Sequence, residues 1–443
     1  MKDLTKGYPA KVIMMFAVPL MISSIFQQLY NMVDSMIVST YVGTAALAAV
    51  GATSVVSNTL IGFIHGLSQG FAILIANSFG AKDMKRMRRF VAGTIVLTFA
   101  VTIVVTVVGF ASIASILEFL NTPEDIMPDA LSYVRIILAG TMFSTIYNMC
   151  ASVLGAVGDS KRPLYCLVAG VITNIALDLL FVRAFGLGIK GAAYATIISQ
   201  ALTALLCGGY LVWKLREILP KGDEWKLEEG QYSNLIASGL SMGLMGCIVN
   251  VGTIVLQGSI NDLGTDIIAA HTAARRILDI LMVMVYIEGV AMTTYVSQNM
   301  GAGLVHRVKQ GVRHANLIVT AITTFLIVIC YLFAEPALKW ITHTENGPII
   351  EAGTMYLQVS VLFFYVLGPL FVLRCSLQGM GRKVVPVIAS VLEMVVKVLS
   401  ANLLVPVFGY VGVAFTEPVS WIIMTTWLTI GYLAKTPDKM FAK

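Results

Sequence analysis

Residues 12–38 read VIMMFAVPLMISSIFQQLYNMVDSMIV, an apolar stretch with one carboxylate, Asp34, near its end. The stretch is longer than the roughly 20 residues that an α-helix needs to cross a bilayer. A carboxylate inside hydrocarbon is costly, so it almost always faces a protein interior or a water-filled cavity and has a role there. The stretch therefore predicts a membrane helix that carries a functional acid.

Further apolar stretches follow along the whole chain. The mean hydropathy is +0.84 and charged residues make up 12% of the sequence, compared with roughly 25% in soluble domains. This composition predicts an all-α integral membrane protein with twelve transmembrane helices. We expect them at about 12–38, 46–78, 90–117, 131–157, 164–184, 190–213, 233–260, 266–299, 314–334, 352–379, 385–406 and 411–434.

The distribution of positive charge predicts the orientation. The loops on the same side as both termini carry most of the 30 Lys and Arg residues, with the strongest cluster between Lys82 and Arg89. Because such loops stay inside the cell, we expect both termini to be cytoplasmic and the protein to lie in a bacterial or archaeal plasma membrane. The first stretch is too long for a cleavable signal peptide. These loops also explain the net charge of +6, and we expect no nucleic-acid partner.

An internal repeat divides the chain into two halves of six spans each. Since each half starts and ends on the same side, the repeat is parallel, with an axis along the membrane normal. We therefore expect an N-terminal six-helix lobe over 1–213, a cytoplasmic linker over 214–232 that serves as a tether, and a C-terminal lobe over 233–443. A shift of 221 residues matches Gly43 with Gly264, Gly80 with Gly301 and Gly191 with Gly412, and a shift of 223 matches Leu154, Gly158 and Pro163 with Leu377, Gly381 and Pro386.

A set of polar residues in the first half has no copy in the second half. In the repeat alignment Asp34 matches Val255, Asn174 matches Lys397, Asp178 matches Ala401 and Thr196 matches Glu417. The scaffold was duplicated without this set, which predicts an ion site in the N-terminal lobe alone.

The depth of these residues supports one common site. Asp34, Asp178 and Thr196 each lie about five or six residues from the outer end of a span, roughly 7–10 Å below the outer boundary. Asn174 is one turn deeper on the face of Asp178. Two carboxylates, an amide oxygen and a hydroxyl suit either Na⁺ or a bound proton. Burial of two neighbouring acids favours proton uptake and a bound Na⁺ favours their ionised form, so both ions stay open.

Polar residues continue from Asp34 toward the cytoplasm. Gln27, Tyr30 and Asn31 lie on one helical stripe with it. Pro19 is deeper in the same span and is expected to kink the helix. We expect filling of the Asp34 site to reposition the span about Pro19. Two residues elsewhere are candidate contacts for a cationic substrate, Tyr147 through its ring and Glu288 through its charge.

The chain resembles the multidrug and toxic compound extrusion (MATE) family over its full length. The matching features are the two six-span lobes, the stretch from Gln27 to Asp34 with Pro19, the pair Asn174 and Asp178, and Thr196 after Gly191. The resemblance implies that Asp34, Asn174, Asp178 and Thr196 form the cation site of the DinF-like branch. It also places Gln27, Tyr30 and Asn148 near a drug cavity.

The resemblance further implies export of amphipathic, often cationic, organic compounds by antiport against Na⁺ or H⁺. The expected partners are these small compounds and membrane lipids; we expect no cofactor besides the coupling ion, and a monomer. The alternative within transport is a lipid-linked oligosaccharide flippase, for which intramembrane Arg and Lys are few.

An enzyme is the least favoured class. The two Gly-x-Ser-x-Gly matches, Gly66–Gly70 and Gly239–Gly243, lie inside apolar spans, whereas a hydrolase elbow lies between a strand and a helix. We interpret both as helix-packing faces of small residues. The six cysteines form no close pair in sequence, which predicts no disulfide framework and no cysteine metal site.

Overall fold

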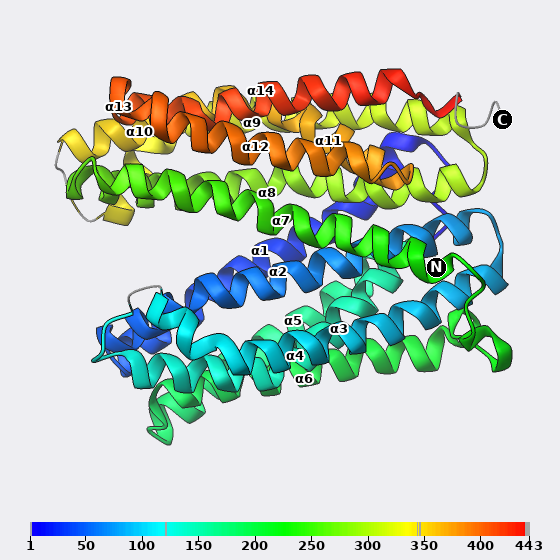
Figure 1. The fold of residues 1–443 in the computed structure, drawn as a ribbon, viewed down its shortest axis with the longest axis horizontal. Coiled ribbons are helices and arrows are strands. Elements are labelled where there is room, and N and C mark those ends of the chain that lie inside the picture. Colours follow the sequence, from blue (N-terminus) through cyan, green and yellow to red (C-terminus); the bar gives the residue numbers. More distant parts are fainter. Residues whose placement is uncertain (1, 120–121, 343, 345–346, 439–443) are drawn as a thin grey trace. The chain divides into compact units, whose positions relative to one another are not determined.

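A computed structural model describes residues 2–119, 122–342, 344 and 347–438. The described chain is helical without strands, and its course can be followed by colour in Figure 1. The elements are α1 Pro9–Tyr41, α2 Thr44–Gly80, α3 Met84–Phe119, α4 Met127–Ala156, α5 Lys161–Asp178, the π-helix η1 Leu179–Ala184, α6 Gly188–Lys214, the 3-10 helices η2 Arg216–Ile218 and η3 Gly222–Trp225, α7 Gln231–Asn261, α8 Thr265–Gly301, α9 Val305–Thr342, α10 Gly347–Leu362, α11 Phe364–Gly379, α12 Val384–Leu403, α13 Val405–Phe408 and α14 Tyr410–Ala434.

The prediction of twelve membrane spans is confirmed. Within the described residues, 11 helices are long and apolar enough to cross a membrane, and the pair α10 and α11 supplies the twelfth span. This pair is bent by 50° at Phe363, a break that the apolar pattern does not predict. The ninth helix starts at Val305, earlier than expected, because its charged first turns continue the helix before the apolar run begins.

The chain forms two compact units, which we call the first and second unit. The first unit holds Ile22–Gly243, and the second holds Asp3–Met21 together with the chain from Leu244 onward. These units follow the two six-span halves except at two segments. The start of α1 packs in the second unit, and the start of α7, up to Gly243, packs in the first.

Both segments are tightly packed. In the second unit the backbone N–H of Leu4 donates to Gln298 at 3.0 Å, and Phe16 belongs to the hydrophobic core. In the first unit a Cβ added to Gly66 would lie 2.8 Å from the Cα of Gly243. Only small residues allow helix backbones to approach so closely, so the expected helix-packing faces of α2 and α7 are confirmed.

The two units repeat one packing scheme. In the first unit α4 packs against α2, α3 and α6, and α6 packs against α5 (Figure 1). In the second unit the bent pair α10 and α11 packs against α8, α9 and α14, and α14 packs against α12. The helices occupy corresponding places in each unit, as the internal repeat predicts.

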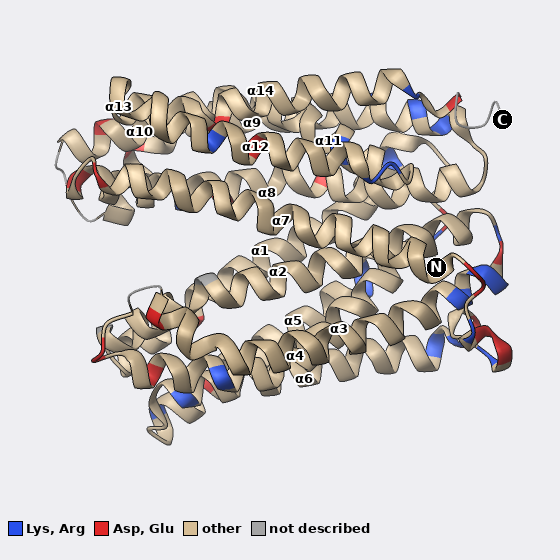
Figure 2. Ribbon diagram, in the orientation of Figure 1, with Lys and Arg blue, Asp and Glu red and all other residues tan. Residues whose placement is uncertain are grey.

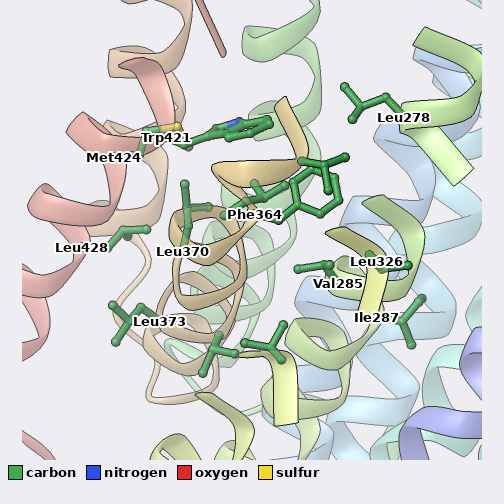
Figure 3. Close-up of a cluster of buried hydrophobic side chains, with 14 of the residues drawn as sticks. Leu278, Val285, Ile287, Leu326, Phe364, Leu370, Leu373, Trp421, Met424 and Leu428 are labelled. Atoms are coloured by element: carbon green, nitrogen blue, oxygen red, sulfur yellow. The ribbon is translucent and has the colours of Figure 1, made fainter. Parts of the chain in front are cut away.

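The core of the second unit is lined by α8, α9, α11 and α14. Figure 3 shows Phe364 and Leu370 near Trp421 and Met424, all of them buried. The rings of Phe364 and Trp421 meet edge to face with centroids 6.0 Å apart, a geometry that aromatic pairs prefer. This packing holds α11 and α14 together next to the charged residues described below.

Most charged residues lie at helix ends and in the connecting segments (Figure 2). At one such place Glu224 of η3 accepts two hydrogen bonds of 2.6 Å from Arg88 of α3. Lys85 pairs with Asp223 at 3.6 Å, and Arg89 pairs with Glu228. The segment 214–232 is therefore folded against the first unit, whereas its composition predicts only a tether.

Candidate functional site

The first unit brings together the two acids that the sequence singles out. Asp34 lies late in α1 and is buried, and Asp178 is the last residue of α5 and is fully buried. Their side chains are close enough to interact directly. The π-helix η1 begins directly after Asp178, and such irregular turns are frequent at functional sites.

The two neutral candidates lie beside these acids. Asn174 is fully buried one turn before Asp178 on α5, so both face the same interior space. Thr196 is buried on α6, and its hydroxyl accepts a hydrogen bond of 3.3 Å from Tyr30 of α1. Tyr30 in turn lies close enough to Asp34 and Asp178 for electrostatic interaction. The structure thus gathers residues from α1, α5 and α6 into one cluster.

Tyr133 is a member of this cluster that sequence reasoning missed. It is buried on α4 and lies within electrostatic range of Asp34, Asp178 and Tyr30. Nothing in its apolar neighbourhood marks it. The internal repeat does, because a shift of 223 residues matches Tyr133 with Tyr356.

The cluster has buried oxygen atoms without a partner. No Lys, Arg or His pairs with Asp34 or Asp178 within the described part of the chain. One carboxylate oxygen of Asp34, both of Asp178 and the amide atoms of Asn174 are buried and accept or donate no hydrogen bond there. Buried polar groups are normally satisfied, so this donor set fits a small cation or shared protons. No group of three or more His, Cys, Asp or Glu suited to a metal ion occurs among the described residues.

The predicted substrate residues of the first unit are more open. Gln27 and Asn31 are exposed on α1. The side-chain oxygen of Asn148 lies 3.2 Å from Nδ1 of His65, and Tyr147 donates a hydrogen bond of 3.4 Å to the carbonyl of Pro163. A cavity of about 380 Å³ in this unit lies between the first turns of α4 and α6, and its lining includes none of these residues.

The other two predicted residues belong to the second unit. Glu288 on α8 is fully buried, and within the described chain neither of its carboxylate oxygens has a hydrogen-bond partner. Pro19 lies inside α1, which continues through it as a single helix, and the chain passes into the first unit at Ile22. Its predicted role as a kink stays a prediction.

A second cluster of buried charges lies in the second unit. Lys397 of α12 pairs with Glu393 at 3.0 Å and lies 4.0 Å from Glu417 of α14. Arg275 of α8 pairs with Glu417 and, at 2.8 Å, with Asp279. The spacing of four residues within α8 and within α12 explains the pairs Arg275–Asp279 and Glu393–Lys397, but Glu417 has no such neighbour on α14. Its partners come from other helices.

Comparisons with known proteins agree with this architecture. The MatE family model matches residues 19–180 and again 242–403. The probable multidrug resistance proteins YpnP and YoeA of Bacillus subtilis are 27% and 28% identical to the chain. YpnP matches over 86% of this chain and 84% of its own length, and YoeA over 85% and 82%.

A solved structure shares the fold. A crystal structure of MATE in the bent conformation superposes with a TM-score of 0.90 at 23% identity, over 99% of this chain and 98% of that one. At this identity the likeness shows the fold alone. The family model, in contrast, covers more than half of the chain in two consecutive copies, so the chain belongs to the MatE family.

Proposed function

We propose that this protein is a secondary active multidrug efflux transporter, which exports amphipathic and often cationic organic compounds by antiport with Na⁺ or H⁺. The observation that carries the proposal is the pair Asp34 and Asp178, two buried acids from different helices with no basic partner among the described residues. Membership of a transporter family, and relatives named as multidrug resistance proteins, support drug export over lipid-linked oligosaccharide flipping and over catalysis.

The coupling ion binds in the first unit. The carboxylates of Asp34 and Asp178 supply the negative charge, and Asn174 and Thr196 supply neutral oxygens. Leaving both acids ionised and unfilled inside the membrane is costly, so the empty and filled states of the site differ in free energy. A conformational equilibrium shifts only when a ligand binds one state better than the other. The bound cation provides this difference in binding free energy between the inward-facing and outward-facing states of the transporter.

Substrate contacts are expected along α1 and α4. Gln27, Tyr30 and Asn31 continue the stripe of Asp34, and Asn148 and Tyr147 offer polar and aromatic contacts. In the second unit, Glu288 is a separate candidate contact for the charge of a cationic substrate. The protein acts in the plasma membrane of a bacterium or archaeon as a monomer surrounded by lipid, with both termini in the cytoplasm, because the loops on that side carry most Lys and Arg.

The test uses purified protein in proteoliposomes loaded with a fluorescent cationic dye. A Na⁺ gradient and a pH gradient are imposed separately, and dye movement is followed against a condition without a gradient. We expect one of the two gradients to drive transport. Asp34→Asn and Asp178→Asn should each remove the response to that gradient, because each leaves a single acid in the site.

Asp129→Asn is the matched control, since this acid is exposed in the first turn of α4. It should transport like the unchanged protein. Equal gradient-driven transport by Asp34→Asn and by the control would overturn the proposal, as would dye movement that responds to neither gradient.

A further inference from the structure

The ammonium group of Lys397 is enclosed by oxygen atoms. Lys397 is 3% exposed, and its Nζ donates to Thr253 Oγ1 at 3.1 Å and contacts Glu393 at 3.0 Å. Glu417 Oε1 lies 4.0 Å away, and the second carboxylate oxygen of Glu417 is buried without a hydrogen-bond partner in the described chain. Two carboxylates and a hydroxyl thus surround one positive charge.

This charge lies where the repeat places the cation site of the first unit. Lys397 is 16 residues after Gly381, as Asn174 is 16 residues after Gly158, and both glycines have positive φ. Glu417 follows Gly412 by the interval that separates Thr196 from Gly191. The helices that carry them, α5 with α6 and α12 with α14, pack together in both units.

A pair of tyrosines gives a third, independent match. Tyr133 lies beside Asp34 and Asp178 in the first unit. Its repeat partner Tyr356 lies beside Glu417, Arg275 and Asp279 in the second. The two clusters therefore occupy the same place in the shared scaffold, although their charged residues differ.

We propose that the second unit contains a permanently filled counterpart of the cation site, in which the ammonium group of Lys397 stands in place of a mobile ion. The proposal rests on the cation role proposed above for the first unit. It assigns Lys397 as the residue that confines ion exchange to the first unit. The oxygen atoms around this ammonium group are then the ligands of a cation site. They come from Glu393, Glu417 and Thr253.

Removal of the Lys397 ammonium group should turn the space between Glu393 and Glu417 into a binding site for free cations. Lys397→Ala leaves Glu393 and Glu417 buried around a space that a small cation fits. Methylammonium carries the same charged head and three N–H donors on a short stem, so it is the probe of choice. Na⁺ is the second probe, and tetramethylammonium, which has no N–H donor, is the control at equal ionic strength.

The measurement is the melting temperature of the purified full-length protein in detergent. We expect Lys397→Ala to lower it by about 5 °C or more, because the variant leaves the buried Glu393 without its basic partner, while Arg275 still pairs with Glu417. Methylammonium should recover about half of that loss or more, and tetramethylammonium none. Lys397→Met should be destabilised without recovery, since its side chain fills the space.

The matched control is Lys339→Ala, which breaks another Glu–Lys pair of the same spacing, with Glu335, on an exposed surface. It should show neither the loss nor the recovery. If Lys397→Ala does not fold alone, Glu393→Gln combined with Lys397→Ala removes one acid with the base and should restore a folded protein. Failure of that double variant to fold would overturn the proposal.

Absence of any methylammonium effect on Lys397→Ala, or equal recovery with tetramethylammonium, would also overturn it. This outcome can be told apart from failure of the cation role proposed for the first unit. The recovery of the melting temperature of Lys397→Ala by methylammonium is measured without any transport. Asp34→Asn in the same assay reports on the first unit alone.

Discussion

The two units share one helix arrangement and a matching buried tyrosine, Tyr133 and Tyr356, but the charge clusters around these tyrosines are built in opposite ways. In the first unit Asp34 and Asp178 lie together without a basic partner in the described chain. In the second unit three acids share two bases, and Lys397 and Arg275 both reach Glu417. A site with unpaired acids can exchange an ion with water, whereas a site that is already paired has no need of one.

The comparison teaches that duplication of a scaffold does not duplicate its chemistry. The position that Asn174 holds in the first unit is held by Lys397 in the second, and the acids around it differ as well. A neutral amide leaves the neighbouring acids available, and an ammonium group neutralises them. The following tests exchange or weaken these features, beginning with the largest expected effect.

Asn174→Lys transfers the arrangement of the second unit to the first. The new ammonium group should pair with Asp178, which is one turn away, and occupy the site permanently. We expect gradient-driven efflux from proteoliposomes to be lost while the protein stays folded. Asn174→Gln keeps the amide and should retain a measurable response. A full gradient response of Asn174→Lys would break the comparison.

Glu417→Gln tests the paired cluster. It leaves Lys397 and Arg275 without the acid that joins them, and removal of one partner of a buried pair costs about 3–5 kcal/mol. Because Arg275 is about a third exposed, we expect the low end of this range, read as a fall in melting temperature. Glu335→Gln removes the acid of the exposed pair with Lys339 and should cost less than about 1 kcal/mol. Equal losses in both variants would contradict the assignment.

Tyrosine substitutions test which of the two clusters binds the coupling ion. Tyr30→Phe removes the hydrogen bond to Thr196, worth about 1 kcal/mol or roughly a fivefold loss of affinity for the coupling ion. Tyr133→Phe should also weaken ion binding, whereas Tyr356→Phe should leave it unchanged. The ion concentration for half-maximal transport measures all three. A shift with Tyr356→Phe as large as with Tyr133→Phe would remove the distinction between the units.

Two ion pairs at the starts of α3 and α9 show a smaller parallel between the units. Arg88 of α3 pairs with Glu224, and Lys309, its repeat equivalent on α9, pairs with Asp438 after the last helix. Hydrogen bonds from Arg88 hold the pKa of Glu224 below its ordinary value of 4.5. A group with a lowered pKa stabilises the folded form above its unfolded pKa, and this contribution is lost as the pH falls through the folded value.

We therefore expect the segment 214–232 to stay docked at neutral pH and to detach only below about pH 4.5. Fluorescence of Trp225, which is half exposed beside Glu224, should report the change. Glu224→Gln should detach the segment at neutral pH and speed its cleavage by trypsin, and Glu229→Gln, at an exposed acid nearby, should not. A pH titration without a change near this range would contradict the assignment.

The sequence predicts the spans well because hydropathy over some twenty residues is a strong signal. It also predicts that Asp34 and Asp178 share a depth, since rise per residue fixes depth along a helix. It does not predict the bend at Phe363 or the partners of Glu417, which depend on contacts between helices distant in sequence.

The exchange of helix segments between the units is a further difference. Asp3–Met21 pack in the second unit although they belong to the first six-span half of the sequence. Hydropathy reports that a segment is buried in lipid or protein but not which helices cover it. Tyr133 could have been found through the repeat, because it matches Tyr356, whereas its apolar neighbours conceal it.

The most direct test of the account is cation binding to purified protein without any substrate. Radioactive Na⁺ binding and proton release or uptake are measured on the unchanged protein, Asp34→Asn, Asp178→Asn and Asp129→Asn. The account predicts saturable binding of one of these ions to the unchanged protein and to Asp129→Asn, and its loss in both other variants. Equal binding by all four proteins would contradict it.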